Sequence, residues 1–305
     1  MKILFLFLDG IGLDENDPEK NPFARAKMPY LQSLLGGQTL TKNSAPFDGD
    51  YASLLALDAG LGVKGLPQSA TGQAVLLTGV NIPSELGYHY GPKPNPEVAQ
   101  YVNGGTIFSK IAKAGKKAAL LNAYPPRYFD GIESGKRLYS SIPLALTNAG
   151  LSLFTQIDYH EGRALSADFT GEGWRSFLGF ADAPIYEAEL AGKKLAELAS
   201  QYDFAFFEYW ASDYAGHKQD MPSAISQLET FDRVLKGLLE AWQAKEGLIV
   251  LTSDHGNMED LSTRKHTNAN VPLLVFGEKI IRHEFQKDIH DLTGVAPAIF
   301  KFLEI

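Results

Sequence analysis

The segment LIVLTSDHGN, residues 248–257, joins a buried strand to a run of polar side chains. Its first five residues are apolar or β-branched without alternation, which is typical of a strand buried on both faces of a parallel sheet. Continuous apolar runs of similar length recur at residues 3–8, 118–122, 204–209 and 272–276. We therefore expect these five segments to form one central sheet.

Segments with helical periodicity lie between these strands. Residues 106–114, 188–200 and 222–244 repeat apolar side chains at helical spacing. Alternating strands and helices predict an α/β core of three layers, with a mostly parallel central sheet flanked by helices. The segment 124–186 differs, because it is rich in glycine, proline and aromatic residues. We expect it to be a small cap inserted into a core formed by residues 1–123 and 187–305.

The composition limits the classes of function that fit the chain. With 305 residues, 45% of them apolar, the chain can bury a large core. A net charge of -8 argues against a nucleic-acid partner, because nucleic-acid-binding proteins usually carry a basic surface. The apolar run at residues 3–8 is too short for a signal peptide or a membrane span, so we expect a cytoplasmic protein without a membrane partner. Since cysteine is absent, any metal must be bound by His, Asp or Glu.

Candidate metal ligands follow the ends of the expected strands. Asp9 follows the first strand, Asp213 and His217 follow the third, and Asp254 and His255 follow the fourth. The carboxyl ends of neighbouring strands in an open α/β sheet meet at one edge, so these side chains should converge there.

A sixth candidate, His266, precedes the fifth strand, so we expect its loop to reach back over the same edge. Carboxylate oxygen and imidazole nitrogen suit Zn²⁺ or Mn²⁺ better than Ca²⁺. The six ligands can fill two metal sites. Two cations about 3.5–4 Å apart can activate the attacking oxygen and stabilise the leaving oxygen of an in-line displacement.

A hydroxyl near a predicted helix start supplies a candidate nucleophile. Residues 67–72 read PQSATG and lead into an apolar, helical segment, so Ser69 should lie near a helix N-terminus. Backbone amides and the helix dipole favour an anion there, whether an alkoxide or a phosphate. A bound divalent cation would lower the pKa of the hydroxyl further.

Together these segments resemble the metal motifs of the alkaline phosphatase superfamily, most closely its cofactor-independent phosphoglycerate mutase and phosphopentomutase branch. The order along the chain matches: an early Asp, a hydroxyl, Asp-x-x-x-His at 213–217, Asp-His-Gly-Asn at 254–257, and a late His at 266. In that superfamily the nucleophile lies ten residues before the Gly of a Thr-Gly pair, and counting back from Gly79 gives Ser69. Thr71 stays an alternative, because Thr-Gly also lies beside the nucleophile in the phosphopentomutase pattern. The resemblance covers residues 1 to about 122 and about 187 to 305.

The resemblance implies two divalent metal ions as cofactors, zinc or manganese, each with its own ligands. The ligands of one ion would be Asp213, His217 and His266. The ligands of the other would be Asp9, Ser69, Asp254 and His255.

Two departures from the mutases favour hydrolysis. The mutases carry a much larger inserted domain, and they carry His where this chain has Gln73. Returning a phosphoryl group to another oxygen needs an enclosed, water-poor site, which a small cap provides poorly. We therefore predict a hydrolase of small-molecule phosphate esters that acts through a phosphoserine at Ser69. A phosphomutase of the same superfamily and a non-catalytic metal-binding module are the alternatives.

A charge count predicts further cationic contacts to the substrate. Two divalent cations are balanced by three aspartates and a serine alkoxide, so a phosphate dianion still needs cationic partners. The candidates are Arg127, Arg163, Arg264 and Lys265. Because arginine binds phosphate in a bidentate manner, we expect Arg127 and Arg163 to contact the substrate.

Overall fold

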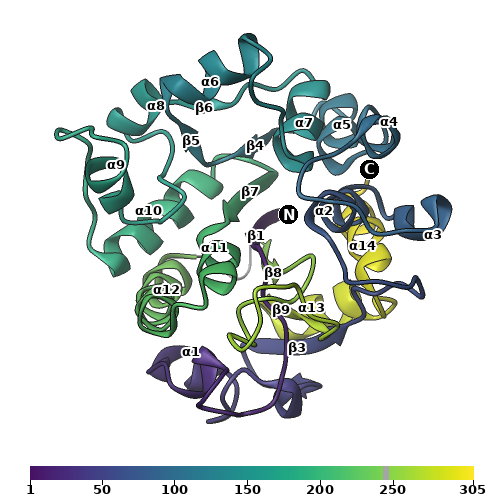
Figure 1. Ribbon diagram of the computed structural model, residues 1–305, viewed down its shortest axis with the longest axis vertical. Coiled ribbons are helices and arrows are strands. Elements are labelled where there is room, and N and C mark those ends of the chain that lie inside the picture. Colours follow the sequence, from purple (N-terminus) through teal and green to yellow (C-terminus); the bar gives the residue numbers. More distant parts are fainter. Residues whose placement is uncertain (243–246) are drawn as a thin grey trace.

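The computed structural model describes residues 1–242 and 247–305. A seven-stranded sheet in the order β2-β3-β9-β8-β1-β7-β4 forms its centre (Figure 1). The strands are β1 (Lys2–Leu8), β2 (Phe47–Asp48), β3 (Ala52–Leu57), β4 (Ala118–Leu120), β7 (Phe204–Tyr209), β8 (Gly247–Thr252) and β9 (Val271–Phe276). A separate pair, β5 (Ala123–Tyr124) and β6 (Phe154–Thr155), forms a two-stranded parallel sheet.

The central sheet is mixed. Strand β1 is parallel to β7 and β8, and β4 is parallel to β7, whereas β9 is antiparallel to β8 and to β3. All five predicted strands are present, and β2 and β3 are additions that the sequence analysis missed. Because β9 runs against β8, its first residue lies at the edge where β1, β7 and β8 end. The expectation that the His266 loop must reach back was therefore wrong: the antiparallel direction of β9 already places it at that edge.

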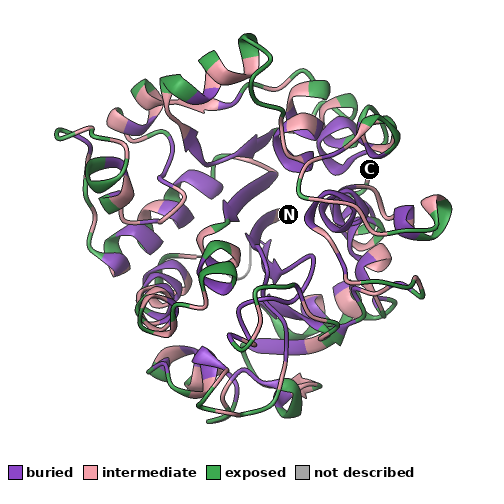
Figure 2. Ribbon diagram, in the orientation of Figure 1, coloured by how far each residue is buried: buried purple, intermediate pink, exposed green. Residues whose placement is uncertain are grey.

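Helices cover both faces of the sheet. One layer contains α2 (Ser69–Thr78), α5 (Ile107–Lys113), α7 (Ser141–Asn148) and α14 (Val295–Leu303), and the other contains α1 (Pro29–Leu34), α10 (Ala188–Ala199) and α12 (Met221–Ala241). Alternate residues of β1 pack into opposite layers, with Phe5 in the first and Leu6 in the second. Figure 2 shows the inner strands of the sheet as buried, whereas β2 and β3 include exposed residues. The predicted three-layer α/β core is confirmed.

The three helices expected from periodicity correspond to α5, α10 and α12. The predicted end of the last helix, at residue 244, lies outside the described residues. The remaining helices are η1 (Pro22–Ala24), η2 (Lys42–Ser44), α3 (Ile82–Leu86), α4 (Pro96–Val102), α6 (Pro126–Glu133), α8 (Gln156–His160), α9 (Glu172–Ser176), α11 (Ala211–Lys218), α13 (Lys279–Gln286) and η4 (Leu292–Gly294). Across residues 1–242 and 247–305, no helix has both the length and the apolar character needed to cross a membrane.

The segment 124–186 contains short helices as well as turns, and its two halves pack differently. Ile142 and Leu146 on α7 belong to the same apolar cluster as α2 and α5. Tyr159 and Trp174 instead form a small cluster of their own, in which their ring centroids lie 4.9 Å apart. The first half therefore joins the main core, whereas the second half surrounds a separate one.

Helices α10 and α12 pack so closely that a side chain at Gly237 has no space. A Cβ at Gly237 would lie 1.9 Å from the carbonyl oxygen of Glu189. We expect Gly237→Ala to lower the free energy of unfolding by roughly 1–3 kcal/mol, because overpacking outweighs the higher helix propensity of alanine. Urea unfolding measures this change. Gly104→Ala is the control, since a Cβ at Gly104 meets nothing within 4 Å. Equal stability of the two variants would contradict the close packing.

Candidate metal centre

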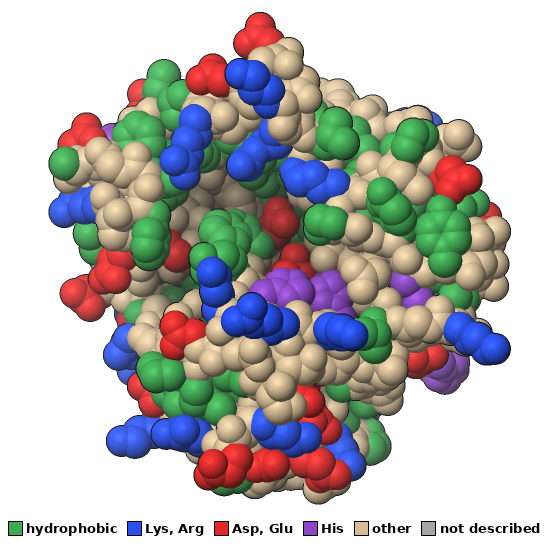
Figure 3. Space-filling model, viewed as in Figure 1, with side chains coloured by type: hydrophobic (Ala, Val, Ile, Leu, Met, Phe, Trp, Pro, Cys, Tyr) green, Lys and Arg blue, Asp and Glu red, His purple; other side chains and the backbone are tan. Residues whose placement is uncertain are grey.

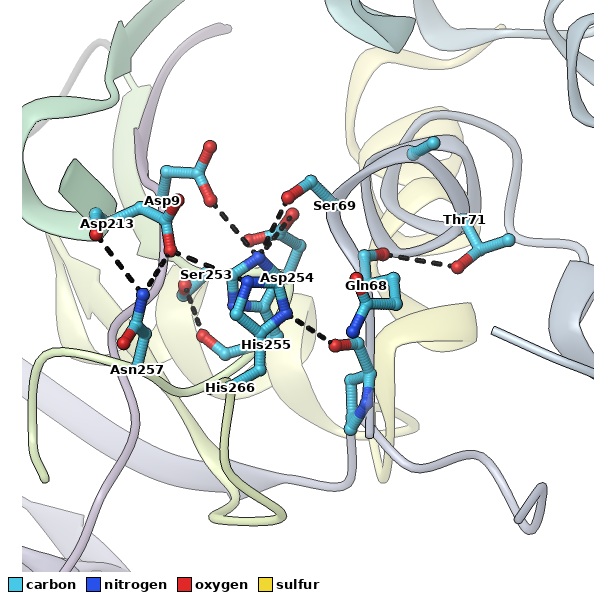
Figure 4. A network of polar contacts seen from close by, with 12 residues as sticks. Asp9, Gln68, Ser69, Thr71, Asp213, Ser253, Asp254, His255, Asn257 and His266 are labelled. Carbon is cyan, nitrogen blue, oxygen red and sulfur yellow. Dashed lines mark hydrogen bonds and ion pairs between the residues drawn. The ribbon is translucent and has the colours of Figure 1, made fainter. Parts of the chain in front are cut away.

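The candidate ligands converge at the carboxyl edge of β1, β7 and β8 (Figure 4). Asp9 follows β1, Asp213 lies on α11 after β7, and Asp254 and His255 follow β8. His266 lies before β9 and reaches the same edge because that strand is antiparallel. The structure thus brings together side chains from loops that are far apart in the sequence.

Asp213, His217 and His266 form one group of possible ligands, whose ligand atoms all lie within 4.8 Å of one another. Nε2 of His217 lies 3.2 Å from Oδ2 of Asp213 and 3.4 Å from Nε2 of His266. The Nδ1 atoms donate to backbone carbonyls, that of His217 to Arg264 at 2.7 Å and that of His266 to Pro67 at 2.7 Å. A carbonyl can only accept, so each proton sits on Nδ1 and the Nε2 lone pairs stay free for a metal.

A second group combines Asp9, Asp213 and His255 within the same limit. Nε2 of His255 lies 3.3 Å from Oδ1 of Asp9 and 3.7 Å from Oδ2 of Asp254. The imidazole rings of His255 and His266 stack with their centroids 3.7 Å apart. Asp213 belongs to both groups, so the two form one continuous cluster.

This cluster buries more carboxylate oxygens than it has donors to satisfy. Asp254 is fully buried, and neither of its carboxylate oxygens has a hydrogen-bond partner in the described part of the chain. Burial and then the charge of Asp9 raise the pKa of Asp254 well above its ordinary value. Burial alone would lower the pKa of His255, but Asp254 and Asp9 raise it to about 10. Buried carboxylates in this state are stabilised by bound cations, so the residues present fit divalent metal ions.

The two candidate hydroxyls face different surroundings (Figure 4). Ser69 opens α2, and its Oγ lies 3.0 Å from Nε2 of His255. The Thr71 hydroxyl donates to the carbonyl of Gln68 at 3.1 Å and accepts from the amide of Tyr90 at 3.1 Å. Backbone groups therefore satisfy the hydrogen bonds of the Thr71 hydroxyl, whereas the hydroxyl of Ser69 faces the ligand cluster.

Two further residues connect the loops that carry the ligands. Glu259 is fully buried and accepts from the amides of Gly12 and Asn257, both at 2.8 Å, and from the hydroxyl of Thr267. Nδ2 of Asn257 donates to Oδ1 of Asp213 at 2.5 Å and to its carbonyl at 3.1 Å. Asn257 is the last residue of the Asp-His-Gly-Asn motif noted in the sequence, whereas the sequence analysis missed Glu259, whose only signal is one acidic residue in a polar loop.

The two predicted substrate contacts differ in the partners that they have. Arg163 donates from Nη2 and Nε to Oδ1 of Asp158 at 2.6 and 2.9 Å, and it also pairs with Glu161. Arg127 is exposed on α6 and forms no hydrogen bond or ion pair within the described residues. Neither arginine is bonded to a candidate ligand. The charge of Arg163 is already balanced inside its own segment.

A hollow lies over the centre of this face (Figure 3). Histidine side chains line one of its edges, acidic side chains lie inside it, and Lys and Arg side chains gather along the opposite edge.

Glu208, near the end of β7, is buried and was missed by the sequence analysis. Burial, and then the charge of Asp9, raise the pKa of Glu208 to about 8.

A model of the family described as the metalloenzyme superfamily matches residues 182–305. The 2,3-bisphosphoglycerate-independent phosphoglycerate mutase of Yersinia pestis (strain Pestoides F) is 29% identical over 126 residues, which cover 39% of this chain and 24% of the mutase. The chain thus spans about a quarter of that relative's length.

Two solved structures share the fold over nearly the whole chain. The PH0037 protein of Pyrococcus horikoshii has a TM-score of 0.57 at 16% identity, covering 99% of this chain and 96% of that protein. The alkaline phosphatase of the Antarctic bacterium TAB5 has a TM-score of 0.52 at 14% identity, covering 99% and 97%.

Residues 182–305 are therefore similar in sequence to the metalloenzyme superfamily, and the fold of nearly the whole chain is similar to that of an alkaline phosphatase. The sequence similarity to a phosphoglycerate mutase covers 39% of this chain, and the likeness to the alkaline phosphatase is one of fold.

The raised pKa of Glu208 predicts how the stability of the metal-free protein depends on pH. The folded protein keeps this carboxyl protonated up to about pH 8, whereas the unfolded chain ionises it near its ordinary value of 4.5. The folded state then binds more protons, so the free energy of unfolding falls as the pH rises through this interval. We expect Glu208→Gln, which cannot ionise, to lose less stability.

Urea unfolding in a chelator at about pH 5 and about pH 8 tests this expectation for both proteins. Equal losses of stability in wild type and variant would contradict the assignment of a proton to Glu208.

Proposed function

We propose that this chain is a metal-dependent phosphoric-ester hydrolase with Ser69 as its nucleophile. The observation that carries the proposal is the position of Ser69 Oγ, 3.0 Å from His255 inside a buried cluster of carboxylates and imidazoles. Ser69 is the first residue of α2, and the N-cap residue Gln68 makes no side-chain cap to that helix. The amide of Thr71 already donates to the carbonyl of Tyr90, so the amides of Ser69 and Ala70 are those that α2 offers to an alkoxide or a phosphoryl oxygen.

Two divalent cations, zinc or manganese, are the proposed cofactors. The proposed ligands of the first are Asp213, His217 and His266, and those of the second are Asp9, Ser69, Asp254 and His255. Bound cations would supply positive charge that lowers the pKa of the serine hydroxyl and stabilises the leaving oxygen. The free Nε2 atoms of His217 and His266 and the unpartnered oxygens of Asp254 support these sets.

The proposed reaction has two displacements at phosphorus. Ser69, having lost its proton to solvent, forms a bond from Oγ to phosphorus while the bond from phosphorus to the alcohol oxygen breaks. The alcohol leaves with a proton taken from water. A water molecule then attacks the phosphoserine, which releases inorganic phosphate and restores the serine hydroxyl.

The division into a core of residues 1–123 and 187–305 and a cap of residues 124–186 is part of this proposal. The separate apolar cluster around Tyr159 and Trp174 supports it for the second half of the cap. A cap this small favours hydrolysis, because water can reach the phosphoserine.

A phosphomutase is the alternative, and the similarity to a phosphoglycerate mutase favours it. The fate of the phosphoryl group separates the two activities. A hydrolase releases inorganic phosphate in proportion to the ester consumed, whereas a mutase returns the phosphoryl group to another oxygen and releases almost none.

Ser69→Ala tests the nucleophile in the hydrolysis of an aryl phosphate with Zn²⁺ or Mn²⁺. We expect kcat to fall by about 10³-fold or more, because the variant lacks the atom that accepts the phosphoryl group. Thr71→Val is the matched control: it removes the neighbouring hydroxyl and should keep most of the activity. Elemental analysis shows whether each variant still binds metal.

Unchanged turnover in Ser69→Ala, or loss of turnover in Thr71→Val alone, would overturn the assignment. Bound metal without turnover of any ester in the wild type would favour the non-catalytic metal-binding module.

A further inference from the structure

Two exposed aromatic side chains lie on α11, the helix that also carries Asp213 and His217. Trp210 is the N-cap residue of α11, and its φ of -93° and ψ of -8° already follow the helical conformation. Tyr214 lies one turn later. Residues at positions i, i+3, i+4 and i+7 of a helix share one face. The two aromatic rings and the two candidate ligands have this spacing, so they form one stripe along the helix.

The packing of α11 fixes the direction in which this stripe faces. Ser212, Ala215 and Gly216 are buried on the other side of the helix. The hydroxyl of Ser212 donates to the carbonyl of Asp9 at 2.6 Å, so the first turn of α11 packs against the loop after β1. Figure 3 shows apolar side chains at the border of the hollow, where Figure 1 places α11. The aromatic part of the stripe therefore borders the ligand cluster.

Neither aromatic ring is used to hold the fold together. The side chains of Trp210 and Tyr214 are 53% and 58% exposed. Within the described residues, the indole of Trp210 makes no hydrogen bond, ring contact or cation–π contact. The ring of Tyr214 has one such contact in the same part of the chain, with the ammonium of Lys218 at 5.4 Å from its centroid. Two adjacent aromatic rings that are left open to solvent beside a polar site offer a ligand a large apolar surface.

We propose that Trp210, extended by Tyr214, stacks on a planar ring in the alcohol part of the substrate. The inference rests on the proposed function and names the substrate class: phosphate esters whose alcohol carries an aromatic or heteroaromatic ring. The continuity of the stripe with the ligand cluster assigns this occupant, because an ester held at Ser69 must place its alcohol in the hollow that the stripe borders. A saturated ring of the same size lacks the π system that gives aromatic pairs their additional attraction.

Binding to zinc-loaded Ser69→Ala protein tests the inference without turnover. The calorimetric probes are two matched pairs: phenyl with cyclohexyl phosphate, and benzyl with cyclohexylmethyl phosphate. The members of a pair differ only in aromaticity, and the second pair moves the ring one bond farther from phosphorus. At about pH 8 all four probes are dianions. We expect the aromatic member of at least one pair to bind about fivefold more tightly or better, as aromatic stacking provides.

Trp210→Ala, added to that protein, should abolish the aromatic preference, whereas Trp210→Phe should keep part of it because a phenyl ring still stacks. Tyr51→Ala is the matched control. Tyr51 is 74% exposed, and it lies at the opposite end of the sheet from the ligands, because its neighbour Ala52 pairs with Phe276 at the end of β9. This control should keep the preference. Elemental analysis and unfolding midpoints confirm that each variant binds metal and is folded.

Three results would overturn the inference: equal binding within both pairs by the parent protein, a preference that survives Trp210→Ala, or a preference that Tyr51→Ala abolishes. Equal binding together with a dimer in solution that Trp210→Ala dissociates would assign the aromatic face to a second copy of the chain instead.

The proposed function fails separately from this inference. Absence of ester turnover in the wild type, with the aromatic preference intact, would overturn the hydrolase and leave the stacking face. Turnover that depends on Ser69, without an aromatic preference, would overturn only the stacking.

Discussion

The buried carboxylate of Asp254 is the constraint on which the rest of the site depends. Both of its oxygens lack a hydrogen-bond partner among the described residues, and Asp9 contributes a second buried negative charge beside it. The two carboxylates share one imidazole, that of His255, and a buried negative charge that stays uncompensated costs several kcal/mol. A fold that concentrates such charges at one edge of its sheet gains stability when cations bind there. Relief of this cost would add to the free energy with which a metal ion binds at this edge.

The surrounding structure fixes the geometry that cations would meet. Backbone carbonyls set the tautomers of His217 and His266, so that both Nε2 atoms face Asp213. Asn257 holds Asp213, and Glu259 connects the loops after β1 and β8 to the loop before β9. Such partners restrict the motion of metal ligands and raise metal affinity. The close approach of α2 then places the hydroxyl of Ser69 against this rigid set.

The sequence was most informative where one segment determines its own structure. Continuous apolar runs marked the buried strands, and polar residues at their ends marked Asp9, Asp254 and His255 as neighbours. The direction of β9 and the presence of β3 depend on pairing between distant segments, which local patterns do not encode. Local patterns also did not show that Arg163 pairs with Asp158. This ion pair balances the charge of Arg163, which the sequence analysis had assigned to substrate binding.

The central claim is that six acidic and imidazole side chains bind two cations beside Ser69. Anomalous diffraction at the zinc absorption edge, from crystals grown with Zn²⁺, tests this claim most directly. The account predicts two peaks about 3.5–4 Å apart, one between His217 and His266 and the other between Asp254 and His255. A single peak, or peaks remote from Asp254 and Ser69, would contradict it.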